Sequence, residues 1–178
     1  MTRAEYENQK KEALRFYDKA GIVITESEAE RIEVCDFGLD KVEEVGLQIL
    51  TYINTERVCA KEMVLTPWQT CPEHKHVPTN GIEGKEETFR CRYGKVHLYV
   101  TGEGKKEDVK AKIPETDVTV FHEVILNPGE QYTIMPETWH WFQAGEDGAV
   151  VSEFSTRSTD ETDCFTDKRI IREPKIKD

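Results

Sequence analysis

The sequence predicts an all-β fold preceded by a helical extension. From residue 45 onward, short segments alternate apolar and polar residues, the period-two pattern of half-buried strands. Glycine, proline, asparagine and aspartate separate these segments, and many short strands divided by turns are typical of a sandwich or a barrel. No repeat or linker divides the 178 residues, which predicts one domain, with a helical extension over 1–44 and a β-barrel over 45–170.

Two capping boxes mark the helical part. Thr2-x-x-Glu5 and Thr25-x-x-Glu28 each place a hydroxyl and a carboxylate where they satisfy the free N–H groups of a first helical turn. Apolar residues recur near helical spacing after the first box, and Gly21 is typical of a helix C-terminus. We therefore expect one helix that ends before Gly21 and a short second helix over 26–32, both packed outside the barrel.

The predicted strands follow in chain order. They cover residues 46–53, 58–65, 96–100, 118–126, 132–135 and 149–154. Turns are predicted at 93–95, 127–130 and 145–148. The charged stretch 102–112 has little pattern, which predicts a solvent-exposed hairpin or insertion.

Composition excludes several classes of function. A net charge of −11 argues against a nucleic-acid partner, because its phosphates would be repelled, whereas a small neutral sugar is little affected. Mean hydropathy is −0.64, and no apolar run reaches the ~18 residues of a membrane span. The chain opens on a charged helix and not on an apolar signal segment. Five cysteines without C-x-x-C spacing predict reduced thiols and a cytoplasmic protein.

Three histidines and one glutamate form the ligand set of an open metal site. His74 and His76 form an H-x-H pair, and on a strand such a pair directs both rings to one face. Glu87 opens a strand-like run, and His140 follows later in the chain. This mixed set suits Mn, Fe, Co, Ni or Zn and leaves positions free for a substrate. A closed structural zinc site would use cysteines, so Cys71 is a less favoured ligand.

The spacing of these residues resembles the two motifs of the cupins. The H-x-H pair and the E-x6-G formed by Glu87 and Gly94 match the first motif. The gap between His76 and Glu87 is longer than is usual. Gly129, Pro136 and His140 resemble the second motif, in which Thr138 replaces the usual glycine. The resemblance implies a double-stranded antiparallel β-barrel, or jelly roll, with a metal at its mouth.

A closer resemblance is to the D-lyxose isomerases within the cupins, over most of the chain from about Gln48 onward. It rests on the segments 60–62, 73–76, 85–87, 136–142 and 153–163. It implies a metal-dependent aldose–ketose isomerase that interconverts D-lyxose and D-xylulose, and also D-mannose and D-fructose. It further implies Mn²⁺ as the ion and a homodimer. Proton transfer through an enediol and a direct hydride shift both remain open.

Glu153 and Lys61 are the catalytic candidates. Glu153 shares strand parity with Val151 and Ser155, which would face the barrel interior, where a carboxylate without a function would be costly. Lys61 is predicted to face inward too, where it would bind a substrate oxygen or donate a proton, because interiors rarely keep an unpaired ammonium group. Glu62, on the opposite parity, is then expected to face outward.

Four further residues are candidates for binding the sugar. Lys85 precedes the ligand Glu87 by two residues and could reach the substrate from a loop. Arg157 and Asp163 belong to a polar run that borders the site in the resemblance. Trp139, beside His140, offers a ring face of the kind that sugars stack on. His97 and His122 match no motif position and are expected to be structural.

Other functions fit the same ligand set. A cupin with these ligands can bind Fe(II) as a dioxygenase, or it can act on a phosphosugar, which would require a basic cluster in the pocket. A non-catalytic sugar-binding cupin would need neither an inward Glu153 nor an inward Lys61. Turnover, its dependence on oxygen and the effect of Glu153→Gln distinguish these functions.

Overall fold

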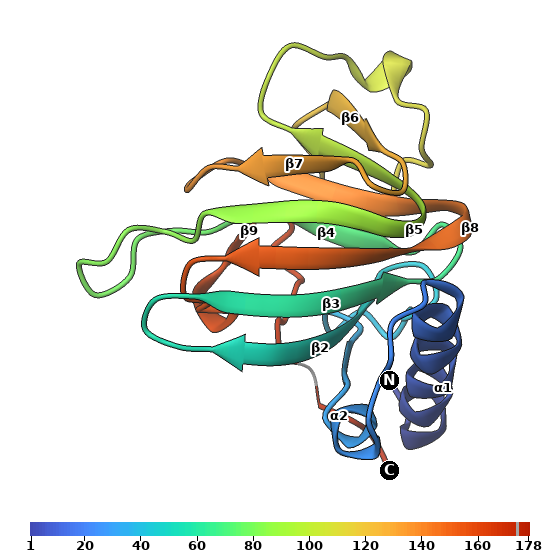
Figure 1. Ribbon diagram of the computed structural model, residues 1–178. Helices are drawn as coiled ribbons and strands as arrows, with labels where there is room; N and C mark the ends of the chain where they lie inside the picture. Colours follow the sequence, from blue (N-terminus) through green and yellow to red (C-terminus); the bar gives the residue numbers. More distant parts are fainter. Residues whose placement is uncertain (174) are drawn as a thin grey trace.

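Two helices lie outside a curled antiparallel sheet in the computed structural model, which describes residues 1–173 and 175–178 (Figure 1). The helices are α1 (Arg3–Lys19) and α2 (Glu26–Glu30). Both predicted capping boxes are formed, with Thr2 accepting from the Glu5 N–H and Thr25 accepting from the Glu28 N–H. Gly21 adopts φ +69° just after α1, a conformation that glycine reaches without steric cost.

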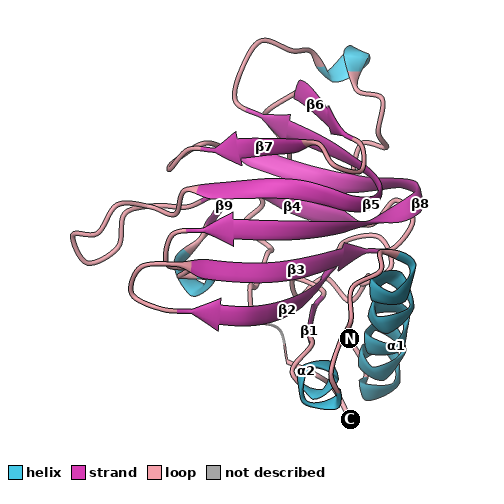
Figure 2. Cartoon of the chain, viewed as in Figure 1, coloured by secondary structure: helices cyan, strands magenta, loops and turns pink. Residues whose placement is uncertain are grey.

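The strands follow along the rest of the chain (Figure 2). They are β1 (Glu33–Cys35), β2 (Leu47–Asn54), β3 (Cys59–Leu65), β4 (Thr70–Lys75), β5 (Glu87–Val100), β6 (His122–Leu126), β7 (Gln131–Ile134), β8 (His140–Ser155) and β9 (Cys164–Phe165). Short 3₁₀ turns lie at η1 (Lys106–Asp108) and η2 (Asp160–Thr162). Strand β1 lies within the segment that was expected to be helical extension.

The long strand β8 organises the sheet. Strand β5 pairs along one side of β8, while β3 and β4 pair in succession along the other side, all antiparallel. The order β1-β2-β3-β8-β4-β9 is completed by β6 and β7, which pair with β5. The curled sheet encloses an apolar core that includes Met63, Phe89, Leu98 and Phe142. The predicted all-β fold with N-terminal helices is confirmed.

Helix α1 covers part of the outer face of the sheet. Phe16 and Tyr17 pack against Leu50, Val64 and Val150 of strands β2, β3 and β8. These strand residues are fully buried because the helix shields a face that would otherwise meet solvent. Two opposite faces of the same strands are therefore buried, one by the barrel core and one by the helix.

Two predicted turns are wrong, because β5 and β8 run through them. Gly94 pairs with Ala149 and Val96 pairs with Ala144, so the register shifts between them and residues 145–148 bulge out. Gly94 adopts φ +72°, and a Cβ on it would clash with the Gly148 carbonyl oxygen. A glycine with positive φ is used in bulges as well as in turns, and here it serves a bulge.

The predicted strand 118–126 is shorter than expected, because β6 begins only at His122. The Glu73 carboxylate accepts the backbone N–H groups of Thr119 at 2.6 Å and Val120 at 3.0 Å. These donors are therefore used by a side chain in place of a strand partner. No helix in the described part of the chain is both long and apolar enough to cross a membrane.

Candidate metal centre and active-site pocket

The four predicted metal ligands converge at one end of the curled sheet. His74 lies on β4 and His76 directly follows it, while Glu87 and His140 are the first residues of β5 and β8. All four are buried, and their ligand atoms lie within 4.8 Å of one another. Three strand ends thus supply a His3Glu set from rigid backbone, and this group could hold a metal ion.

Each histidine is oriented by a hydrogen bond at its Nδ1 atom. His74 Nδ1 lies 2.8 Å from the Pro72 carbonyl, His140 Nδ1 2.9 Å from the Thr138 carbonyl, and His76 Nδ1 2.6 Å from Asp163 Oδ1. Since these oxygens accept, each Nδ1 carries the proton and each Nε2 is directed toward the centre. Metal-binding histidines are commonly held in this way.

The Nε2 atoms and the Glu87 carboxylate that face the interior of the cluster could bind a cation. His140 Nε2 is buried without a hydrogen-bond partner among the described residues, although Glu87 Oε1 lies 3.1 Å away. His76 Nε2 lies 3.1 Å from the same Glu87 oxygen. Burial and the neighbouring His140 and His76 lower the pKa of His74 well below its usual value. Burial opposes charge on His76 too, but Glu87 and Asp163 together outweigh it and raise the pKa of His76 to about 9. The donor set fits a divalent metal, which would bind the rings in their neutral form and would displace a proton from His76.

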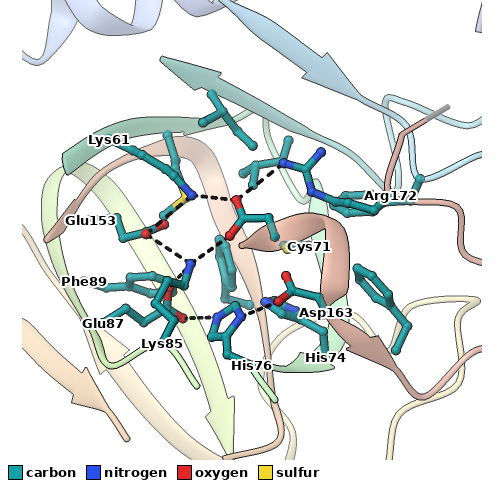
Figure 3. A pocket seen from close by; sticks show the side chains of 17 residues that line it. Lys61, Cys71, His74, His76, Lys85, Glu87, Phe89, Glu153, Asp163 and Arg172 are labelled. Atoms are coloured by element: carbon teal, nitrogen blue, oxygen red, sulfur yellow. Dashed lines mark hydrogen bonds and ion pairs between the residues drawn. The ribbon is translucent and has the colours of Figure 1, made fainter. Parts of the chain in front are cut away.

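A pocket opens beside the cluster, and both apolar and charged side chains line it (Figure 3). The apolar lining consists of Phe37, Leu47, Ile49, Met63, Phe89, Phe142 and Phe165. The charged lining includes Lys61, Lys85, Glu153, Asp160, Asp163 and Arg172.

The predicted catalytic residues face this pocket from paired strands. Lys61 on β3 and Glu153 on β8 are register partners, and the Lys61 Nζ and Glu153 Oε1 atoms lie 3.6 Å apart. The predicted loop lysine, Lys85, is also buried, and its Nζ lies 3.1 Å from Glu153 Oε1 and 2.8 Å from Glu87 Oε2. Lys85 therefore links the metal ligand set to Glu153.

Both lysines are charged. Burial opposes the charge on Lys61, but Glu153 and Asp160 outweigh it and raise its pKa. Lys85 is fully buried, yet Asp160, Glu153 and Glu87 raise its pKa well above the usual range. An ammonium group held in this state donates hydrogen bonds and stabilises negative charge, and it does not accept a proton.

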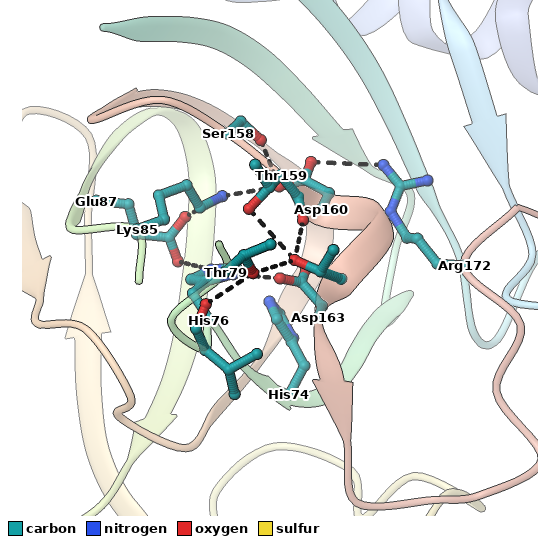
Figure 4. A network of polar contacts seen from close by, with 12 residues as sticks. His74, His76, Thr79, Lys85, Glu87, Ser158, Thr159, Asp160, Asp163 and Arg172 are labelled. Atoms are coloured by element: carbon teal, nitrogen blue, oxygen red, sulfur yellow. Dashed lines mark hydrogen bonds and ion pairs between the residues drawn. The ribbon is translucent and has the colours of Figure 1, made fainter. Parts of the chain in front are cut away.

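Asp160 is the first residue of the turn η2 and Asp163 directly follows it, so both side chains point into the same region (Figure 4). Asp163 contacts the ligand His76 and thereby orients it, a contact that differs from the predicted contact with the sugar. Asp160 bridges the lysines, with Oδ2 2.6 Å from Lys61 Nζ and Oδ1 3.2 Å from Lys85 Nζ. Burial opposes the charge of Asp160, but the two lysines lower its pKa well below the usual value.

Sequence reasoning missed Ser158 and Arg172. It placed Asp160 in the polar run with Arg157 and Asp163, as a possible contact of the sugar, and not at the centre of this network. Ser158 Oγ accepts from Lys61 Nζ at 2.9 Å and donates to Asp160 Oδ1 at 2.5 Å. The three-residue spacing of Asp160 and Asp163 was a usable signal, because residues i and i+3 share one side of a 3₁₀ turn. Arg172 had no such signal.

Two predicted sugar contacts lie outside the pocket. Arg157 is exposed and pairs with Glu56, and Trp139 lies under the ammonium group of Lys75, which is 5.1 Å from its ring centre. Neither side chain lines the pocket. Both residues border strand ends, and the sequence pattern does not tell which side of such an end faces the site.

The two histidines expected to be structural lie apart from the metal ligands. His97 Nδ1 is 3.2 Å from Glu123 Oε1, and His122 Nδ1 is 2.9 Å from the Glu103 carbonyl. Neither of them lines the pocket. Cys71 does line it, but the thiol is fully buried, which raises its pKa well above the usual value and opposes the thiolate that a metal would need.

The fold and the His3Glu cluster define a cupin barrel with a site that could hold a metal ion. In overall structure the chain is similar to L-ribose isomerase from Cellulomonas parahominis, with a TM-score of 0.73 and 18% identity, covering 96% of this chain and 94% of that one. It is also similar to L-ribose isomerase from Geodermatophilus obscurus, with a TM-score of 0.71 and 16% identity over 93% and 92% of the two chains. At these identities the likeness concerns the fold.

Sequence comparison gives a closer relationship. Residues 18–178 match the D-lyxose isomerase family. The chain is 63% identical to the D-lyxose/D-mannose isomerase of Thermosediminibacter oceani over 90% of each chain. It is 54% identical to the D-lyxose ketol-isomerase of Cohnella laeviribosi over 99% of this chain and 98% of that one. The chain belongs to the D-lyxose isomerase family.

Proposed function

We propose that this protein interconverts D-lyxose and D-xylulose as a metal-dependent aldose–ketose isomerase. One observation carries the proposal: a buried carboxylate, Glu153, lines the same pocket as three members of a His3Glu ligand set. The relatives named D-lyxose isomerase support the choice of sugar, and the relative named for D-mannose supports D-mannose and D-fructose as a second pair.

Glu153 is the proposed base. Isomerisation transfers one hydrogen from C2 of the aldose to C1 of the ketose, and one hydroxyl proton from O2 to O1. In the enediol route, Glu153 takes the proton from C2 and returns the same proton to C1, which leaves the enzyme unchanged. Lys61, the register partner of Glu153, carries a proton already and cannot act as the base. Glu153 is therefore the member of this pair that can accept a proton.

Lys61 and Lys85 are the proposed partners of the sugar oxygens. Both ammonium groups lie within 3.6 Å of Glu153, so an oxygen next to the reacting carbon would come within their reach. They would stabilise the negative charge that develops on the oxygens, as preorganised donors do in a closed site. Asp163 would hold His76 in the orientation that metal binding needs. We propose no sugar contact for Arg157 or Trp139.

When bound, a divalent cation at the His3Glu centre would supply electrostatic stabilisation of the sugar oxygens. We propose Mn²⁺ as this ion, since the mixed set of nitrogen and oxygen ligands accepts it; Zn, Co, Fe and Ni are also accommodated by such ligands. We further propose one domain, a homodimer and a cytoplasmic location. The five cysteines, which lack the spacing of a disulfide framework, support the cytoplasmic location.

The charges of the pocket favour an unphosphorylated sugar. The cations that line it are Lys61, Lys85 and Arg172, and each is already paired with carboxylates. A phosphate would meet these carboxylates together with the cations and would have to compete with them. A neutral sugar meets no such competition.

The test is D-lyxose turnover by metal-stripped protein, with and without added Mn²⁺, under nitrogen. The proposal predicts D-xylulose formation that requires the metal and does not require oxygen. Turnover only with Fe(II) and oxygen would replace the isomerase with a dioxygenase. Sugar binding without turnover in the metal-loaded protein would indicate a non-catalytic sugar-binding protein.

Turnover in D2O distinguishes the two chemical routes. If Glu153 carries the proton, part of the D-xylulose acquires solvent deuterium at C1, because a protonated carboxyl group exchanges with water. A direct hydride shift would leave C1 free of solvent deuterium at every extent of conversion, and it would remove the need for a base.

A further inference from the structure

Arg172, near the C-terminal end, connects the helical extension to the pocket. Its guanidinium group lies between two carboxylates, with Nη1 2.5 Å from Glu33 Oε1 and Nη2 3.5 Å from Asp160 Oδ2. We propose that Arg172 is a positioning residue, which holds Asp160 so that Asp160 keeps Lys61 and Lys85 directed at Glu153. This inference rests on the proposed isomerase function.

The backbone around Arg172 is fixed against the segment that follows β1. The Ile171 N–H donates to the Phe37 carbonyl at 2.9 Å, and the Cys35 thiol donates to the Arg172 carbonyl at 3.2 Å. The Arg172 side chain is only 15% exposed. A largely buried guanidinium group on a fixed backbone has few alternative positions, so it can hold the position of the carboxylate that it contacts.

Asp160 is the residue that benefits from this contact. Its Oδ2 atom faces Lys61 and Arg172, while Oδ1 faces Lys85 and Ser158. Figure 4 shows Asp160 between Arg172 on one side and Lys85 and Ser158 on the other. It lies at the start of a three-residue 3₁₀ turn, which supplies little backbone support of its own. Among the described residues, Arg172 is the one cation on Asp160 that comes from outside the barrel strands and the loop of Lys85. It therefore limits movement of Asp160 away from the strands.

The chemistry of arginine suits this position. The planar guanidinium group presents Nη1 to Glu33 and Nη2 to Asp160 at the same time. A lysine has a single ammonium centre on a flexible stem and does not bridge two carboxylates with the same fixed geometry. The substitution Arg172→Lys should therefore retain the charge and lose much of the positioning.

The same residues separate the pocket from a second cleft. Lys61, Asp160 and Arg172 line the metal-site pocket, and they also line an outer cleft together with Glu33 and Asn54. The ion-pair network is thus a wall between the two spaces. Loss of Arg172 should loosen this wall and admit water to Lys61 and Lys85, which are 4% and 5% exposed.

The experiment compares Arg172→Ala with Arg169→Ala in the metal-loaded protein. Arg169 is on the same segment, but it pairs with Asp167 and does not line the pocket. We expect Arg172→Ala to lower kcat for D-lyxose about tenfold, with little change in KM or metal content, because the reacting groups are misplaced. Arg172→Lys should recover part of this loss, and added guanidinium ion should raise kcat of Arg172→Ala alone. Arg169→Ala should match wild type.

A double-mutant cycle tests the route through Asp160. In the Asp160→Asn background, Arg172→Ala should cause little further loss, because its partner is already absent. A full additional tenfold loss, or an Arg172→Ala variant as active as Arg169→Ala, would overturn the inference. Absence of D-lyxose turnover in the wild type would instead count against the proposed function.

A second readout does not depend on turnover. Acetylation of lysines by acetic anhydride, followed by mass spectrometry, reports access of solvent to Lys61 and Lys85. We expect both to react severalfold faster in Arg172→Ala than in Arg169→Ala at a temperature where both variants are folded. Equal rates in the two variants would show that Arg172 does not hold the wall, whatever the sugar.

Discussion

Two neighbouring rungs of the β3–β8 ladder bury a carboxylate on opposite faces of the same sheet. Lys61 pairs with Glu153 on the inner rung, and Glu62 pairs with Ser152 on the outer rung. Glu153 is 2% exposed and Glu62 is 6% exposed, so burial hardly separates them. The residues that surround the two carboxylates differ. The comparison teaches that burial alone does not make a carboxylate a catalytic candidate, and that the groups around it do.

The inner carboxylate is surrounded by donors. Glu153 Oε1 lies 3.1 Å from Lys85 and 3.6 Å from Lys61, and it accepts from Ser155 Oγ at 2.9 Å. The outer carboxylate has one donor, Ser152 Oγ at 2.8 Å, and its Oε2 has no partner among the described residues. Burial accordingly raises the pKa of Glu62. The inner rung surrounds its carboxylate with donors, and the outer rung leaves one oxygen of its carboxylate without a partner among the described residues.

The largest effect is expected from removing one of the four candidate metal ligands, which lie on the same side of the sheet as the Lys61–Glu153 pair. Loss of a residue that only hydrogen-bonds to a metal ligand lowers metal affinity by up to about 100-fold. His140→Ala removes a ligand itself, so metal affinity should fall by more than this, and activity should fall with it. Metal content by mass spectrometry and D-lyxose turnover measure both. His122→Gln, an exposed histidine, serves as the control and should keep both. A His140→Ala protein that retained metal and turnover would place the centre elsewhere.

The next effect is expected from the lysine of the inner rung. Lys61→Met removes the charge while keeping most of the side-chain volume, and kcat should fall about 100-fold, as for loss of one preorganised donor. Thermal stability should also fall, because Asp160 loses its 2.6 Å ion pair. Lys95→Met, on an exposed position of β5, is the control. Comparable kcat values for the two variants would remove Lys61 from the chemistry.

The smallest effect is expected on the outer rung, and it depends on pH. Because the folded-state pKa of Glu62 is raised, the protonated form is favoured in the folded protein. The stability that it contributes is complete below the unfolded value near 4.5 and is lost as pH rises through the folded pKa. Glu62→Gln resembles the protonated form and avoids this loss.

Urea unfolding at pH 4 and pH 8 measures this difference. Glu62→Gln should equal wild type at pH 4 and exceed it at pH 8, by about 1 kcal/mol or less, as for most single substitutions away from a site. A difference between the two proteins that did not change with pH would contradict the raised pKa.

The metal ligands could be predicted because period two fixes the direction of side chains on a strand. His74 and His76 on or next to β4, and Lys61 and Glu153 on paired strands, all follow from parity. Parity also directed Glu62 outward, but it could not tell that α1 covers this face, where the Tyr17 hydroxyl donates to the Glu62 carbonyl at 3.0 Å. Coverage of a strand face depends on tertiary packing.

The remaining part of the site comes from segments without a period. Asp160 and Arg172 lie on a short turn and on the C-terminal segment, where spacing does not fix the direction of a side chain. Arg157 was placed at the site by its neighbours in the chain and points to Glu56 instead. The glycines at 94 and 148 are used in bulges and not in turns, because both structures require positive φ.

The most direct test of the central claim compares Glu153→Gln with Glu62→Gln. Both replace a buried carboxylate of the same strand pair by an amide of the same shape. With metal content verified, we predict that kcat for D-lyxose falls about 10²–10⁴-fold in Glu153→Gln, as expected for loss of a general base, and stays at the wild-type value in Glu62→Gln. Full turnover by metal-loaded Glu153→Gln would contradict the assignment of Glu153 as the base.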